Sequence, residues 1–161
     1  MVNYFLSEEQ QMIVDVARQI TAEKIIPQRV ELDEKEQFPT EILHAIAQAD
    51  LFGLYVPEEY GGFGGGSFDM VLALEEFARG CVGVATSFAA SALGAYPILI
   101  SGSEELKQKY MPVIASGEKL AAIGLNEANT GRDDSSLHPT QLLERDESVL
   151  SATRLDTTST G

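Results

Sequence analysis

Apolar residues recur at helical spacing through the first 120 residues of this chain, and the pattern then stops. Positions three or four apart lie on one face of a helix. The first such face comprises Ile13, Val16, Ala17, Ile20 and Ile25. Ser7, followed three positions later by Gln10, is typical of the capping box that begins a helix. This helix is predicted to run to about Ile26, because Pro27 follows it.

Four further helices are predicted by the same spacing and by their capping residues. Their expected ranges are 39–52, 67–80, 84–99 and 103–117. In the last of them, Leu106, Tyr110 and Ile114 are expected to line the inner face, and Pro112 is expected to bend or break the helix. Residues 54–57 are predicted to be a short extended link.

The period changes at residue 120. Residues 120–125 are continuously apolar, which predicts a short buried strand. Residues 132–161 include only 7 apolar residues in 30 and no aromatic one, too few for a core of their own. We therefore predict a mainly α chain, with a helical domain over residues 1–120. Residues 121–161 are expected to be the incomplete start of a β-domain, with a poorly ordered tail.

Charge and composition exclude several functions. The 161 residues include 11 Lys and Arg against 25 Asp and Glu, a formal charge of -14. Such a chain repels phosphate backbones and anionic membranes, which excludes nucleic-acid binding driven by charge. One cysteine and two distant histidines argue against a disulfide or a zinc site, so no metal ligand is predicted. No targeting segment precedes the first helix, and the expected location is the cytoplasm.

The most apolar stretch, residues 82–100, is interrupted by glycine, serine, threonine and proline. It is interpreted as a buried helix and not as a membrane span. The small residues along it would allow another helix to pack closely. Cys81, just before it, is interpreted as a small apolar filler, because no histidine lies nearby in sequence. His44 lies on the polar side of the second predicted helix and is interpreted as a surface or capping residue.

Glycines concentrate at residues 61–66. A phosphate-binding loop is one interpretation, but such loops end in Lys-Ser or Lys-Thr and follow a strand, and here Ser67-Phe68 follows between helical flanks. A turn between helices is favoured. The paired carboxylates at 58–59, 75–76 and 104–105 are expected to be solvated, because adjacent residues point to different sides of a helix.

Residues 124–133 carry the segment with the most chemistry. The predicted strand feeds a polar turn, Gly-Leu-Asn-Glu-Ala-Asn-Thr-Gly-Arg-Asp, which is dense in hydrogen-bond donors. Turns of this kind hold the edge of a flavin or a pyrophosphate. Taken alone, the segment favours an ordinary turn over a cofactor-binding one.

The order of the motifs resembles the acyl-CoA dehydrogenases over residues 1 to about 136. The matching motifs are LSEEQ at 6–10, FP at 38–39, PEEYGG at 57–62, LEEFA at 74–78, GSEELK at 102–107, YMP at 110–112 and GLNEA at 124–128. Each piece is weak alone, and the ordered series is specific. The resemblance is greatest to short-chain, butyryl-CoA-type bacterial members.

The resemblance implies an oxidoreductase of fatty-acid metabolism, a flavoprotein in which FAD takes a hydride from an acyl-CoA. Electrons then pass to electron-transferring flavoprotein. The family fold has a helical N-terminal domain, a middle β-domain and a C-terminal helical domain, and full-length members are homo-oligomers. The residues near 93–96 would lie close to the acyl pocket. The catalytic carboxylate belongs to the C-terminal domain, so no catalytic residue is assigned here.

Site residues carry over from the family loop position by position. The residues assigned to the cofactor are Ile123, Leu125, Asn126, Gly131, Arg132 and Thr158. Asn126 replaces a threonine that bonds the flavin ring. Arg132 replaces a serine that touches both pyrophosphate and substrate, so it is also the substrate candidate; it can pair with phosphate, but it is bulkier. Asp156 replaces the tryptophan that stacks over the flavin.

Two hypotheses follow. The first is an FAD-dependent acyl-CoA dehydrogenase, present as a truncated chain that is inactive alone, from a shortened or frame-disrupted gene. The second is a non-enzymatic helical module that packs on a partner through the small-residue face of residues 84–99 and the strand 120–125.

Overall fold

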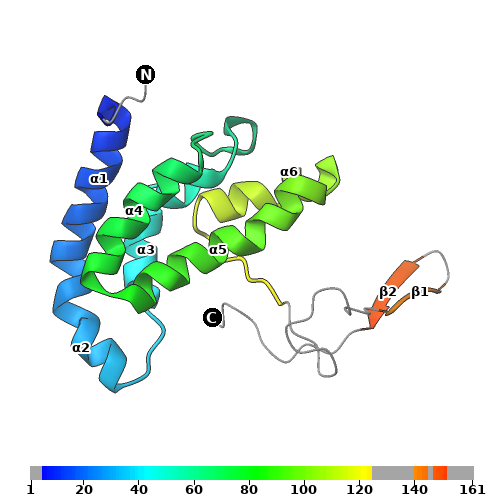
Figure 1. The fold of residues 1–161 in the computed structure, drawn as a ribbon. Coiled ribbons are helices and arrows are strands. Elements are labelled where there is room, and N and C mark those ends of the chain that lie inside the picture. The colour runs from blue at the N-terminus through cyan, green and yellow to red at the C-terminus, as the bar shows by residue number, and fades with distance from the viewer. Residues whose placement is uncertain (1–4, 125–139, 145–146, 152–161) are drawn as a thin grey trace.

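The computed structural model describes residues 5–124 in full and the backbone of residues 140–144 and 147–151. Six α-helices make up most of the first range (Figure 1). They are α1 (Glu8–Ile20), α2 (Ile26–Glu34), α3 (Thr40–Gln48), α4 (Ser67–Gly80), α5 (Val82–Ser101) and α6 (Glu104–Ala115). The mainly helical class predicted from the sequence is confirmed.

Helical backbone does not end at Pro27. A π-helical turn, Thr21–Ile25, joins α1 to α2, and Pro27 lies in the first turn of α2. Proline is tolerated there because its missing N–H would have no regular helical partner in a first turn. The predicted end of the first helix at about Ile26 is therefore wrong, and helical structure continues to Glu34.

The link between α3 and α4 is more compact than predicted. α3 ends at Gln48, and Asp50 adopts a left-handed conformation with φ of 57°. Leu51–Tyr55 and Glu58–Tyr60 then form 3₁₀ turns. The prediction of an extended link over 54–57 is wrong for Leu54 and Tyr55, because apolar side chains of the first 3₁₀ turn are buried in the core.

The glycine-rich stretch is a turn, as predicted, and it is tightly held. The N–H of Phe63 donates to the carbonyl of Gly53, and that of Gly64 to the carbonyl of Val56, each at 2.9 Å. A Cβ at Gly62 would lie 2.0 Å from the Val56 carbonyl oxygen. Glycine is therefore required at Gly62 by close backbone approach.

Phe88 of α5 lies at the centre of the core. Its ring centroid is 5.0 Å from that of Phe52 and 5.4 Å from that of Phe77 of α4, at the tilted and edge-on angles that aromatic pairs prefer. α5 is long and apolar enough to cross a membrane by length and composition alone. Here one face of it belongs to the core, as the buried-helix prediction requires; its core residues are Val84, Ala85, Phe88, Ala92 and Ala95.

α6 packs through a different face from the one predicted. Met111 and Ile114 are buried, but Leu106 and Tyr110 are 44% and 38% exposed. The prediction that these two line the inner face is wrong, because α6 contacts α5 and the Leu51–Tyr55 turn through its C-terminal half. Pro112 is exposed and does not break the helix, which continues to Ala115.

Residues 120–124 form no strand in the part of the chain that the structure describes. The backbone of residues 121 and 122 lies against α5, and none of the described strands pairs with this segment, so the predicted strand is wrong for residues 120–124. Further along, β1 (Thr140–Glu144) and β2 (Glu147–Ser151) pair antiparallel, with Thr140 opposite Ser151 and Glu144 opposite Glu147. Division into domains at residue 120 stays a prediction.

Candidate functional site

One predicted cofactor residue, Ile123, lies within the described residues, where it is half-buried. The others, Leu125, Asn126, Gly131, Arg132 and Thr158, lie outside them. The structure therefore shows how the chain enters the predicted flavin loop, and not the loop itself.

The segment that enters this loop is seated on α5. The N–H of Ala121 donates to the hydroxyl of Ser91 at 3.1 Å, and Ser91 is fully buried. One helical turn further on, a Cβ at Gly94 would lie 2.5 Å from the nitrogen of Ala122 and 2.7 Å from the carbonyl carbon of Ala121. We call these two α5 residues, Ser91 and Gly94, the seat.

Tyr55 lies beside the seat with a buried hydroxyl. Burial raises the pKa of Tyr55 to about 12, and the nearby Ser91 hydroxyl lowers it by less. Among the described residues, the Tyr55 hydroxyl has no hydrogen-bond partner of good geometry. Its ring lies 6.2 Å from that of Tyr96, within the stretch 93–96 that the resemblance assigns to the acyl pocket. Leu93, in the same stretch, is half exposed.

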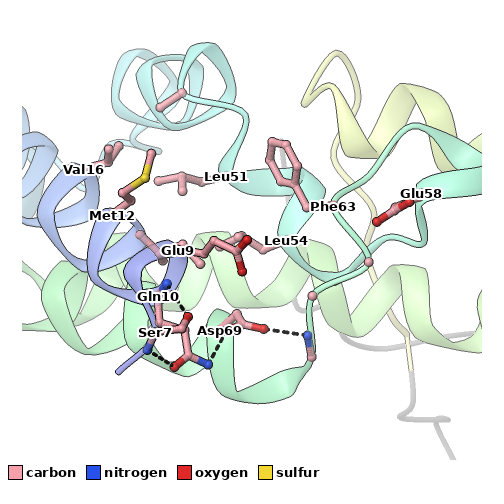
Figure 2. A pocket seen from close by; sticks show the side chains of 15 residues that line it. Ser7, Glu9, Gln10, Met12, Val16, Leu51, Leu54, Glu58, Phe63 and Asp69 are labelled. Atoms are coloured by element: carbon pink, nitrogen blue, oxygen red, sulfur yellow. Dashed lines mark hydrogen bonds between the residues drawn. The ribbon is translucent and has the colours of Figure 1, made fainter. Parts of the chain in front are cut away.

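A groove of about 610 Å³ opens between α1, the turns after α3 and the start of α4. Figure 2 shows Met12, Val16, Leu51 and Phe63 around it. Met12 and Phe63 are 66% and 57% exposed. Glu9, Glu58 and Asp69 also line it, so an apolar floor carries an acidic rim.

Hydrogen bonds join the two helices at the end of this groove (Figure 2). Ser7 and Gln10 form the predicted capping box of α1, each side chain bonding the other's backbone N–H at 3.1 Å. The amide of Gln10 also donates to Asp69, whose second oxygen accepts from the N–H of Gly66 at 2.8 Å. Asp69 thus caps α4 from within its first turn.

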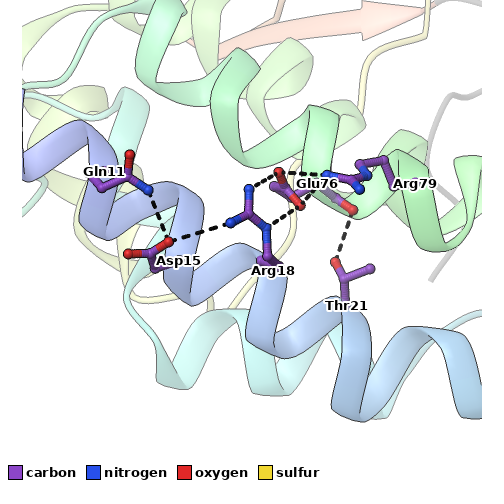
Figure 3. Close-up of polar contacts among 6 residues, drawn as sticks. All are labelled: Gln11, Asp15, Arg18, Thr21, Glu76 and Arg79. Carbon is purple, nitrogen blue, oxygen red and sulfur yellow. Dashed lines mark hydrogen bonds and ion pairs between the residues drawn. The ribbon is translucent and has the colours of Figure 1, made fainter. Parts of the chain in front are cut away.

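A second polar cluster lies between α1 and α4 (Figure 3). Glu76 is buried, and Arg18 donates to both of its carboxylate oxygens, at 2.8 and 3.2 Å. Arg79 adds a bond at 3.3 Å, and the Thr21 hydroxyl donates to the Glu76 carbonyl at 3.0 Å. The hydrogen bonds from Arg18, followed by its charge and that of Arg79, hold the Glu76 pKa below its usual value although burial opposes them.

The prediction that all paired carboxylates are solvated is therefore wrong for Glu76. Its partner Arg18 is 58 positions away, so no local pattern could reveal the pair. Glu58, Glu59, Glu75, Glu104 and Glu105 are exposed as predicted. The phenol of Tyr60 donates to Glu104 at 2.8 Å, and this bond, with one from Lys107, lowers the Glu104 pKa.

The remaining candidates behave as predicted. His44 is exposed on α3, and Cys81 is a partly buried free thiol between α4 and α5. Within the described residues, no three His, Cys, Asp or Glu side chains come together as a metal site. The sequence missed the groove and the seat. The glycine and small residues of α5 were the only signal for the seat, and they indicated close packing without naming the packed segment.

Comparison with known proteins assigns the family. Residues 7–118 match the model of the acyl-CoA dehydrogenase N-terminal domain. A short-chain specific acyl-CoA dehydrogenase of Clostridium acetobutylicum is 34% identical over an alignment of 162 positions, which covers 99% of this chain and 42% of that protein. The chain therefore spans about two fifths of the length of this relative.

Solved structures agree. Butyryl-CoA dehydrogenase from Megasphaera elsdenii superposes with a TM-score of 0.89 at 30% identity, covering 97% of this chain and 42% of that one. An acyl-CoA dehydrogenase from Bacillus anthracis, solved in complex with FAD, superposes with a TM-score of 0.86 at 31% identity, covering 98% and 28%. The chain belongs to the acyl-CoA dehydrogenase family, and residues 7–118 are its N-terminal domain.

Proposed function

We propose that this chain is the N-terminal part of an FAD-dependent dehydrogenase of short-chain acyl-CoA thioesters, located in the cytoplasm. The observation that carries the proposal is the seat: α5, which bears the stretch 93–96, also holds the segment that enters the predicted flavin loop. Acyl pocket and flavin loop would thereby share one rigid helix. Homo-oligomerisation, as in full-length members, belongs to the same proposal.

The donors in this chain fit FAD only in part. Asn126 offers an amide to a flavin ring edge, and Arg132 offers a guanidinium to a phosphate. Asp156, in contrast, cannot stack on a flavin as the family's aromatic residue does, and its charge repels a pyrophosphate. When bound, FAD would supply the hydride acceptor. These 161 residues contribute part of its binding surface and no assigned base.

We therefore expect the 161 residues by themselves to lack dehydrogenase activity. The experiment adds FAD to the purified chain, records the visible flavin spectrum after removal of free FAD, and assays butyryl-CoA with a dye as electron acceptor. Bound flavin without turnover is the expected result. Turnover by the chain alone would contradict the expected inactivity, and a colourless protein would contradict flavin binding.

The groove supports a second part of the proposal, which is that the chain binds a partner protein there. An apolar centre with a polar rim is typical of protein interfaces. The rim residues Glu9, Glu58 and Asp69 disfavour a nucleotide or CoA phosphate there, because like charges repel. We assign the groove to the electron-accepting flavoprotein partner that the family resemblance names.

The same groove also favours the alternative, a non-enzymatic helical module that packs on a partner. The two functions predict a different colour for the purified protein and a different binding partner. A flavin-bound chain that binds an electron-transferring flavoprotein supports the dehydrogenase. A colourless chain that forms defined complexes without such a flavoprotein supports the module.

A further inference from the structure

Two residues of α5 contact the same short stretch of backbone. Ser91 and Gly94 are three positions apart and so lie on one face of the helix. Ser91 accepts a hydrogen bond from the N–H of Ala121. Gly94 leaves no room for a side chain, because residues 121 and 122 pass directly over it. A directed bond and a close approach therefore act together on residues 121–122.

Because Ser91 is buried, its hydroxyl needs a hydrogen-bond partner inside the protein. The residue is fully buried in the helix that bears Phe88, where an unbonded hydroxyl is unfavourable. The neighbouring Tyr55 hydroxyl is buried as well, and it lies close enough to Ser91 for that hydroxyl to lower its pKa. At the seat, a buried polar group therefore lies among apolar residues, and the backbone N–H of Ala121 is the donor that bonds it.

This pairing fixes a register. A slip by one residue would take the N–H of Ala121 away from the Ser91 hydroxyl and place a different residue over Gly94. With Ala121 on Ser91, the chain leaves a fixed point on α5 before it reaches the predicted flavin loop, which begins at residue 124 in the sequence. A segment free to slide would start that loop from several positions.

We propose that Ser91 and Gly94 are positioning residues for the flavin loop, which hold the backbone of residues 121–122 in one register against α5. The inference rests on the proposed function for its flavin part only. The seat itself can be tested without cofactor, so its failure and that of the proposed function are separable.

The test variants are Ser91→Ala, which removes the acceptor, and Gly94→Ala, whose Cβ would displace the segment by about 1 Å to reach normal van der Waals separation. Matched controls lie in the same helix. Ser87 bonds the carbonyl of its own helix at Gly83, so Ser87→Ala leaves the segment alone. A Cβ at Gly83 would meet only the Cys81 sulfur, at 3.7 Å, so Gly83→Ala fits.

The first measurement is amide hydrogen exchange in the full 161-residue chain. Exchange at residues 121–123 is expected to be about five-fold faster in Ser91→Ala, the factor that corresponds to one ordinary hydrogen bond. Gly94→Ala is expected to accelerate it at least as much, although alanine favours helix α5 itself. Both controls should match the unsubstituted chain. Equal exchange rates in Ser91→Ala and Ser87→Ala would overturn the proposal that the seat holds residues 121–122.

The second measurement is a titration with FAD, followed by the visible flavin spectrum of the complex. Affinity is expected to fall about two- to five-fold in the seat variants, because the binding-competent register is less populated. The spectrum should change with it, whereas neither should change in the controls. Faster exchange with unchanged affinity and spectrum would overturn the flavin part alone. Failure of the unsubstituted chain to bind FAD would overturn the proposed function and the flavin part together.

Discussion

Helices α1 and α4 lie side by side, and the two ends of the pair differ (Figure 1). At one end, which we call the open end, the groove lies between α1 and the turns after α3, and the hydrogen bonds among Ser7, Gln10 and Asp69 join the two helices near the surface. At the other end Glu76 is buried beneath Arg18, and Thr21 bonds its carbonyl. At this second, closed end the two helices are therefore joined by a buried carboxylate, whereas at the open end they are joined by hydrogen bonds close to solvent.

The largest effect is expected in the glycine-rich turn, next to Phe63 of the groove lining. Gly62→Ala should lower the free energy of unfolding by about 3 kcal/mol or more, because its Cβ would lie 2.0 Å from the Val56 carbonyl oxygen. Gly61→Ala is the control. Gly61 has φ of 84° but open space, so its loss should be about 1 kcal/mol. Equal losses in urea unfolding would show that conformation, and not space, sets the requirement for glycine.

The closed end should respond to loss of its carboxylate. Glu76→Ala is expected to lower the free energy of unfolding by about 2 kcal/mol, less than for a fully buried pair, because the half-exposed Arg18 can return to water. Glu75→Ala, at the exposed neighbour, should change it by less than about 0.5 kcal/mol. If urea unfolding gave the two variants the same stability, the closed end would not depend on this ion pair.

Acid should weaken the closed end selectively. Arg18 lowers the pKa of folded Glu76 below the ordinary value of 4.5, so the carboxylate stabilises the fold above that value. The stabilisation is lost as the pH falls through the lowered pKa of the folded state. The difference in stability between the unsubstituted chain and Glu76→Gln should therefore shrink from neutral pH towards about pH 3. A difference that grew in acid would contradict this sign.

Local signals predicted most of the helices. Ser7 with Gln10 and Ser103 before α6 begin their helices as expected, and Gly80 ends α4. These signals depend on residues within one turn of each other, which a sequence displays directly. Pro27 misled because proline stops a helix from within but is tolerated in a first turn, and only the π-helical turn before it gives α2 a new start.

Features that depend on distant partners could not be predicted. Glu76 meets Arg18 across 58 positions, and Ser91 meets Ala121 across 30. The groove depends on how far α1 lies from the turn that bears Phe63, which no spacing encodes. Family motifs predict a role for residues 124–133, which stays a prediction, but they do not indicate the helix surface on which the preceding segment lies.

The capping box offers a smaller test at the open end. Ser7→Ala should lower the free energy of unfolding by about 1 kcal/mol, because the N–H of Gln10 loses its acceptor. Ser103→Ala, which removes the cap of α6, should have a similar effect. The two differ in place: amide exchange should rise in the first turn of α1 for Ser7→Ala and in that of α6 for Ser103→Ala. We expect the two ends of the α1–α4 pair to respond independently. Faster amide exchange around Glu76 in Ser7→Ala would contradict that expectation.

The smallest effect on stability should accompany a loss of binding. Met12→Ser changes a groove side chain that is 66% exposed, so the free energy of unfolding should change by less than about 0.5 kcal/mol. Val30→Ser on α2, 61% exposed and outside the groove lining, is the matched control. Calorimetric titration with a purified bacterial electron-transferring flavoprotein should show weaker binding for Met12→Ser only. Equal binding by both variants would show that the partner binds to another surface. The groove at the open end of the α1–α4 pair would then have no role in docking.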